Sequence, residues 1–143
     1  MQTLLDTAHC RLTLYRYPRQ SQDPLQAWDT ADEYLISHLA ESQQVPDGPV
    51  IIMNDGFGAL ACALAGHAEV TSSGDSFLGA LALHKNLARN GLAPAAVRFV
   101  PASEAPQGPF DVVLVRVPKT LALLEEQLIR LHGQLAPGAQ VVA

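Results

Sequence analysis

Over the last two thirds of the chain, short apolar runs alternate with segments in which hydrophobic residues recur at helical spacing. Short continuous apolar runs are typical of strands covered on both faces. They predict five strands, at Pro49–Met53, Ala68–Ser72, Val97–Pro101, Phe110–Val117 and Ala139–Ala143. Helices are predicted between them, at Ala59–Ala65, Ser76–Arg89 and Thr120–Leu135. Alternating strands and helices predict an α/β fold of right-handed βαβ units, with a mostly parallel sheet and helices on both faces.

The first third of the chain predicts an extension packed on this core. Arg11–Tyr17 alternates and is rich in β formers, so we expect a strand. Asp23 followed by Pro24 is typical of a helix start. Apolar residues then recur at helical spacing, at Leu25, Trp28, Ala31, Leu35 and Leu39. We expect an extension over residues 1–45 and a βαβ core over residues 46–143, together one compact domain.

Composition narrows the class of protein. The chain has 143 residues, of which 48% are hydrophobic and 16% charged, and this balance excludes disorder. No apolar run is long enough to span a bilayer, so we expect a cytoplasmic protein without a membrane partner. The net charge of −5 argues against strong nucleic-acid binding by this chain alone. The five histidines and two cysteines show no ligand spacing, so no metal site is expected.

The order of elements and three sequence runs resemble a known family. The order of elements resembles that of class I S-adenosylmethionine-dependent methyltransferases. It consists of a strand, a glycine turn, a helix, a strand ending near an acid, a helix ending in Asn-Gly, and Leu-x-Pro-Gly before the last strand. The runs LQAWDTADEYLISHL, NDGFGAL and VPKTLALLEEQL are similar to the N-terminal domain of two-domain ribosomal RNA guanine-N2 methyltransferases. Among these, the chain most resembles the enzymes that act on large-subunit (23S) RNA.

The resemblance implies a division of labour between two domains. In that family the C-terminal domain binds S-adenosylmethionine and catalyses the reaction, and the N-terminal domain resembles a degenerate copy. We therefore expect no cofactor in this domain, a C-terminal catalytic domain as partner, and weak contacts with ribosomal RNA. The family's sheet has two more strands, so we also expect a fold truncated after the fifth core strand.

The turn after the first core strand matches the family's Asp-x-Gly-x-Gly-x-Gly motif only in part. Gly56 and Gly58 match, whereas Asn54 replaces the acid, or the acid is displaced to Asp55. Leu60 replaces the last glycine, and we expect its side chain to crowd the place of the cofactor's methionine part. The two glycines could belong to a cofactor site or could simply allow a tight strand-to-helix turn. We favour the turn, because glycine motifs alone are weak signals.

The acid after the second core strand has two interpretations. Asp75 lies where the family's acid binds the ribose of the cofactor. It could equally be the N-cap of the helix Ser76–Arg89, and we favour the cap because it needs no ligand.

The fourth core strand gives the strongest evidence about catalysis. In family members that methylate an exocyclic amine, this strand begins with Phe-Asp and ends in Asn-Pro-Pro-Phe. Here Phe110-Asp111 is followed by Arg116-Val117-Pro118-Lys119, so only the second proline is kept. Arginine cannot accept a hydrogen bond from the target amine, and Lys119 offers no ring for stacking. Both add positive charge beside the pocket of a cationic cofactor, which argues against catalysis in this domain.

Three hypotheses follow. The first is a non-catalytic domain of a ribosomal RNA methyltransferase; the second is a working S-adenosylmethionine enzyme that uses Asp55, Gly56, Gly58 and Asp75. The third is a domain that binds another nucleotide, with Arg116 and Lys119 receiving its phosphate. For RNA phosphates the candidates are Arg116, Lys119, and Arg11, Arg16 and Arg19 near Tyr15 and Tyr17, although an ordinary strand surface explains the second group better.

Overall fold

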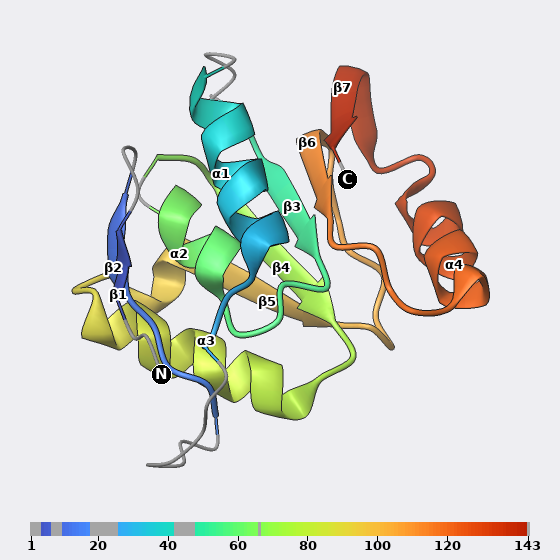
Figure 1. Cartoon of the computed structure of the whole chain (residues 1–143). Helices are drawn as coiled ribbons and strands as arrows, with labels where there is room; N and C mark the ends of the chain where they lie inside the picture. The colour runs from blue at the N-terminus through green and yellow to red at the C-terminus, as the bar shows by residue number, and fades with distance from the viewer. Residues whose placement is uncertain (1–3, 7–9, 18–25, 42–47, 66, 143) are drawn as a thin grey trace.

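A parallel five-stranded sheet forms the centre of the molecule (Figure 1). The computed structural model describes residues 4–6, 10–17, 26–41, 48–65 and 67–142. The strand order is β5-β4-β3-β6-β7. The strands are β3 (Val50–Met53), β4 (Val70–Gly74), β5 (Val97–Pro101), β6 (Phe110–Val115) and β7 (Leu135–Val142). The predicted α/β fold with a parallel sheet is confirmed.

The two most apolar strands lie at the centre of this sheet. All four residues of β3 are buried, and four of the six residues of β6 form the buried run Val112–Val115. β3 pairs in parallel with β6, Val50 opposite Val112, and on its other side with β4, Val50 opposite Val70. A strand covered on both faces and on both edges needs apolar side chains at every position, which is why these runs do not alternate.

Helices cover both faces of the sheet, as predicted, but unequally (Figure 1). The helices are α1 (Thr30–Glu41), α2 (Ala59–Leu64), α3 (Phe77–Arg89) and α4 (Leu121–Leu131), with a 3₁₀ turn at Pro94–Ala96. Side chains of α1, α2 and α3 share one apolar cluster with Val50 and Ile52 of β3. Ile51 and Met53, on the other face, form a smaller cluster with Leu131 and Leu124 of α4. Within the described ranges, none of these helices is long and apolar enough to cross a bilayer.

The N-terminal segment forms a hairpin that the sequence showed only in part. β1 (Leu4–Asp6) pairs antiparallel with β2 (Arg11–Thr13), and Leu5 lies opposite Leu12. Both leucines are buried in the cluster that also contains Leu60, so residues from the N-terminal 45 and from the core pack together. The predicted strand Arg11–Tyr17 is too long, because β2 ends at Thr13, and β1 was missed.

The helix α1 begins later than predicted. The predicted start at Asp23-Pro24 lies outside the described residues, but residues 26–29 are not helical and α1 starts at Thr30. Asp29 and Asp32 set this start by bonding each other's backbone: Asp29 Oδ1 accepts from the Asp32 N–H (3.0 Å) and Asp32 Oδ2 accepts from the Asp29 N–H (3.1 Å). Trp28 therefore packs in the core just ahead of the helix.

The last helix ends earlier than predicted. α4 stops at Leu131, and Gly133 adopts a left-handed φ of 86° that closes the turn. Leu135 consequently belongs to β7 and not to the helix, so β7 begins four residues before the predicted Ala139. Ala143 lies outside the described residues.

Candidate functional site

The carboxyl edge of the sheet brings most of the predicted site residues together. The chain runs from β3 outward to β4 and β5, then returns to the other side of β3 to form β6 and β7. Ligands of open α/β sheets bind at such a reversal, beyond the carboxyl ends of the strands. Asn54, Asp55 and Gly56 follow β3 here, Asp75 follows β4, and Arg116 follows β6.

Asn54 stands at the motif's acidic position, and its side chain is committed to contacts within the chain. Its Nδ2 donates to the Arg116 carbonyl oxygen (3.0 Å) and to Oε1 of Gln127 (2.9 Å). Gln127 Nε2 donates in return to Asn54 Oδ1 (2.8 Å). This reciprocal amide pair ties the end of β3 to α4. Gln127 is buried, and no sequence pattern pointed to it, because it lies 73 residues from its partner in a helix with an ordinary pattern.

Asp55 holds the start of α2. Its carboxylate accepts hydrogen bonds from the backbone N–H groups of Leu60 (3.3 Å) and Ala61 (2.9 Å), which have no partner in the helix itself. Burial raises the pKa of Asp55 to about 7, against the lowering effect of these hydrogen bonds. The carboxyl group is therefore an internal cap whose ionisation is opposed by its surroundings.

Leu60 does not crowd the place predicted for the cofactor. Its side chain is completely buried in the main apolar cluster, with Leu83 of α3, and so belongs to the core. Gly58 explains this packing: it has a φ of +96°, and a Cβ there would come within 2.8 Å of Leu83 Cδ1. At Gly56, by contrast, a Cβ would meet nothing within 4 Å. Gly58 is thus required by the turn, whereas Gly56 borders open space.

An open cavity lies between the ends of β3 and β4. It measures about 200 Å³ and includes Asn54, Asp55, Gly56, Asp75 and Phe99 in its lining. A neighbouring cavity of about 360 Å³ shares Asp75 and Phe99 and extends to Ser103. Asp75 is exposed there and does not cap the following helix. The N-cap is Ser76, whose Oγ accepts from the Gly79 N–H (2.9 Å), so the favoured cap interpretation of Asp75 is wrong.

Arg116 is paired with the two aspartates that begin α1. Its guanidinium contacts Asp29 Oδ2 and Asp32 Oδ1, each at 2.5 Å. Burial raises the pKa of Asp32, although Arg116 acts in the opposite direction. Burial also opposes the ionisation of Asp29, but the hydrogen bonds from Asp32 and Arg116 outweigh it and lower the pKa of Asp29. The expected excess of positive charge at this edge is therefore wrong for Arg116, because two carboxyl groups face its one guanidinium.

The remaining motif residues lie apart from these contacts. Pro118 is partly buried and Lys119 is exposed, on the connection that leads to α4. Neither lines the cavity that contains Asp55 and Asp75. Across the described ranges, no group of three His, Cys, Asp or Glu side chains could hold a metal ion.

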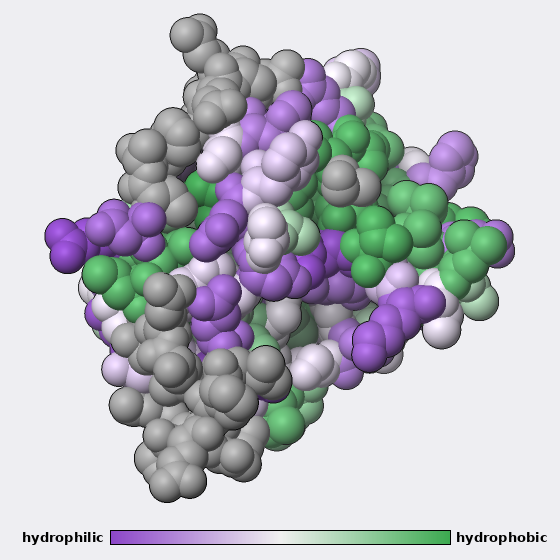
Figure 2. Space-filling view, in the orientation of Figure 1, coloured by the Kyte–Doolittle hydropathy of each residue, from purple (hydrophilic) through white to green (hydrophobic). Residues whose placement is uncertain are grey.

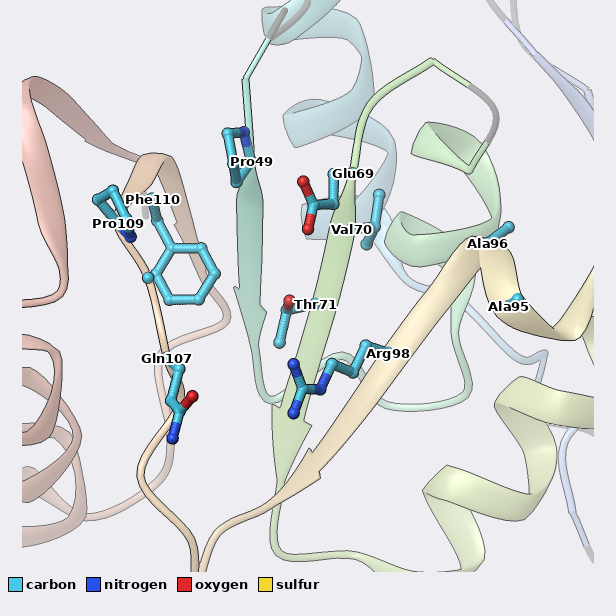
Figure 3. Close-up of a pocket in the computed structure, with 11 residues that line it drawn as sticks. Pro49, Glu69, Val70, Thr71, Ala95, Ala96, Arg98, Gln107, Pro109 and Phe110 are labelled. Atoms are coloured by element: carbon cyan, nitrogen blue, oxygen red, sulfur yellow. The ribbon is translucent and has the colours of Figure 1, made fainter.

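A larger cavity, of about 460 Å³, lies at the opposite, amino edge of the sheet (Figure 3). The Phe110 ring lines one side of this cavity. The other side is lined by Glu69, the residue before β4, by Thr71 of β4 and by Arg98 of β5. The connection from β5 to β6, which is described throughout, contains no helix that could cover this part of the sheet. No sequence pattern pointed to this cavity, because its lining comes from strand ends far apart along the chain.

Comparisons with known proteins place this geometry in a family. The model of the RLMG N-terminal domain matches residues 2–143. Ribosomal RNA large subunit methyltransferase G of Pseudomonas fluorescens is 66% identical over 141 residues, which are 99% of this chain and 38% of that protein. The corresponding protein of Stutzerimonas stutzeri is 67% identical over 98% of this chain and 37% of its own length. The chain thus spans well under half of the length of these relatives.

Solved structures confirm the predicted class I methyltransferase fold. The Thermus thermophilus 16S rRNA N2 G1207 methyltransferase, in complex with AdoMet and guanosine, superposes with a TM-score of 0.75 at 20% identity. The match covers 95% of this chain and 39% of that one. A ribosomal protein L11 methylase from Lactobacillus delbrueckii gives a TM-score of 0.67 at 17% identity, over 98% and 78% of the two chains. With the family model matched over nearly its whole length, the chain belongs to the RLMG N-terminal domain family.

Proposed function

We propose that this chain is the non-catalytic N-terminal domain of a methyltransferase that modifies guanine N2 in 23S ribosomal RNA. It supports a C-terminal catalytic domain and helps to place the RNA. The observation that carries the proposal is the pairing of Arg116 with Asp29 and Asp32. Arg116 stands where the family's amine-accepting asparagine is expected, and a guanidinium has no acceptor to offer an amine.

The other polar groups at this edge support the same proposal. Asn54 is paired with Gln127, and Asp55 caps α2. Catalysis of methyl transfer to an amine requires acceptors that face the substrate. Here Asn54 and Asp55 bond within the chain, so a substrate would have to break internal contacts in order to use them, whereas Asp75 stays exposed.

S-adenosylmethionine belongs, in this proposal, to the catalytic part of the full-length enzyme. The relatives are methyltransferases by name, and structures of the same fold have been solved with this cofactor or its product. In this proposal the cofactor site is weakened, because the Asn54 and Asp55 oxygens beside the glycine turn are engaged in hydrogen bonds within the chain, whereas Asp75 remains exposed. Leu60 is not an obstacle to the cofactor, since it packs in the core.

Calorimetric titration of this chain with S-adenosylmethionine tests the proposal. We expect no binding tighter than about 100 μM, roughly −5.5 kcal/mol. The Thermus thermophilus enzyme that has been solved with AdoMet is the positive control. Tighter binding, together with transfer of a labelled methyl group to unmodified large-subunit RNA, would overturn the non-catalytic role.

A second candidate function rests on the open cavity beside Asp75. An exposed carboxylate next to Phe99 and Gly56 could accept hydrogen bonds from ribose hydroxyls of another nucleotide. The same titration with adenosine and adenosine monophosphate tests it. Heat that disappears in Asp75→Ala would support this function, and absence of heat would exclude it.

A further inference from the structure

Three cation–π contacts join the N-terminal segment, the glycine turn and helix α3 into one surface. The Arg16 guanidinium lies 5.1 Å from the centre of the Phe57 ring. Lys85 Nζ lies 5.3 Å from the Tyr17 ring, and the Arg89 guanidinium 4.4 Å from the Tyr15 ring. We call this surface the basic–aromatic patch; it consists of Tyr15, Arg16, Tyr17, Phe57, Lys85 and Arg89. Its members come from three separate stretches of the chain: the sequence pointed to Tyr15, Arg16 and Tyr17, and the fold adds Phe57, Lys85 and Arg89.

Two asparagines at the end of α3 fix the segment that carries half of this patch. Asn90 Oδ1 accepts from the Thr13 N–H (2.7 Å), and its Nδ2 donates to the Thr13 carbonyl (2.8 Å). One turn earlier, Asn86 does the same for Tyr15, at 2.9 and 3.0 Å. The two side chains thus bond the backbone of residues 13–15 much as a neighbouring strand would. The tyrosine backbone is consequently held in place before any ligand arrives, which lowers the entropic cost of binding.

The patch is also positively charged within an acidic protein. The segments 10–17 and 77–89 contain Arg11, Arg16, Lys85 and Arg89, four of the chain's nine Lys and Arg residues. They contain none of its fourteen Asp and Glu residues, although Asp6 lies opposite Arg11 in the hairpin. With a net charge of −5 for the whole chain, positive charge is concentrated here and negative charge elsewhere.

We propose that the basic–aromatic patch is the surface through which this domain binds RNA. This inference rests on the proposed function and gives it a location. Lysine and arginine side chains beside aromatic rings suit the phosphates and bases of an unpaired strand. The Arg116 region is unsuited to phosphates, because Asp29 and Asp32 face its guanidinium. An acidic protein segment would use the cations but not the rings, so RNA is the better match.

Fluorescence anisotropy with a labelled hairpin of large-subunit ribosomal RNA tests this surface. The whole chain is titrated at several salt concentrations, alongside Lys85→Gln/Arg89→Gln. We expect the double variant to bind about tenfold more weakly, with a salt slope lower by about one to two units. Arg98→Gln is the matched control, since it removes one exposed cation from β5, and it should change affinity by less than about twofold.

A single variant separates loss of RNA contacts from loss of stability. Arg89 also bonds Asn86, whereas Lys85 is exposed and its contact with the Tyr17 ring is a weak one at such a site. Lys85→Gln alone must therefore weaken binding while its melting temperature stays unchanged. Three results would each overturn the assignment of RNA binding to this patch. They are equal weakening of binding in Arg98→Gln, a larger weakening in Lys119→Gln, and competition by polyglutamate that is as effective as competition by unlabelled RNA. None of these results changes what the titration with S-adenosylmethionine measures. Failure of the RNA-binding patch can therefore be distinguished from failure of the proposed non-catalytic role.

Discussion

At the scale of single residues, Asp55 predicts an unusual response to pH. Its folded pKa of about 7 exceeds the ordinary value of 3.8. Between those values the folded protein keeps a proton that the unfolded chain has released, so the free energy of unfolding falls as pH rises. Asp55→Asn keeps an acceptor for the α2 cap but cannot ionise. In this variant we expect the part of the pH dependence of the unfolding free energy that comes from Asp55 to disappear.

Urea unfolding at pH 5 and pH 8 measures this effect. Relative to Asp55→Asn, the unmodified chain should lose roughly 2 to 3 kcal/mol between pH 5 and pH 8. Asp75→Asn, at an exposed acid beside the same cavity, is the matched control for removing a carboxyl group there. Parallel pH curves for the unmodified chain and Asp55→Asn would show that the Asp55 carboxyl ionises freely in the folded state.

Residue identities at the site were predictable from the sequence, but their partners were not. The spacing after Phe110-Asp111 identified Arg116 as the replacement for an asparagine. Its partners Asp29 and Asp32 lie 87 and 84 residues away, and no local pattern links them to it. The wrong prediction for Leu60 has a similar origin: the left-handed turn at Gly58 directs α2 so that Leu60 faces the core.

At the scale of elements, the contact between α3 and residues 13–15 predicts a large stability effect from one buried amide. Asn86 is fully buried and bonds both polar backbone groups of Tyr15 and the Phe57 carbonyl. Asn86→Ala removes these bonds from partly buried backbone groups, so we expect a loss of about 3 kcal/mol. His84→Ala, at an exposed position of the same helix, should stay within about 0.5 kcal/mol.

Limited proteolysis locates this effect. Cleavage within the first 17 residues should accelerate in Asn86→Ala well before the rest of the chain is attacked, because the Asn86 bonds hold that segment specifically. A uniform increase in cleavage over the whole chain would instead mean that Asn86 supports the core in general.

Element types were easier to predict than element boundaries. Short runs rich in β-branched and aromatic residues, such as Val97–Pro101, indicated strands, and β5 has the predicted bounds. Boundaries depend on single capping contacts. The Asp29–Asp32 pair starts α1 seven residues after the predicted Asp23, and Gly133 ends α4 four residues before the predicted Leu135. β1 has only three residues, too few to show a period.

At the scale of the whole molecule, the unequal cover of the sheet predicts self-association. Among the described residues, β7 is the last strand in the sheet order, and Val141 on it is 52% exposed. Figure 2 shows apolar surface gathered on the side of the molecule that carries β6, β7 and α4. Pairing with β6 is irregular near Phe110 but regular over residues 140–142, so this part of β7 forms a regular edge. An edge with apolar neighbours is a template for another strand.

Sedimentation velocity from micromolar to near-millimolar concentration checks this prediction. The chain should become increasingly dimeric, and Val141→Lys should shift it back to the monomer by placing a charge on the edge strand. Ile129→Lys, on the exposed face of α4, distinguishes helix packing from edge pairing. A monomer at every concentration would show that the edge is already protected within the chain.

Under the proposed function, the ion pair at Arg116 also constrains how evolution could place a substrate-facing amide at this position. Arg116→Asn would restore the residue type of the catalytic motif in one substitution. It would also leave buried Asp32 beside Asp29 without this compensating cation, and stranding a buried charge costs several kcal/mol. Under the proposed non-catalytic role, an asparagine could therefore be placed here only together with changes at Asp29 or Asp32, which themselves cap α1. The order of mutations is restricted, because the ion pair disfavours Arg116→Asn as the first step.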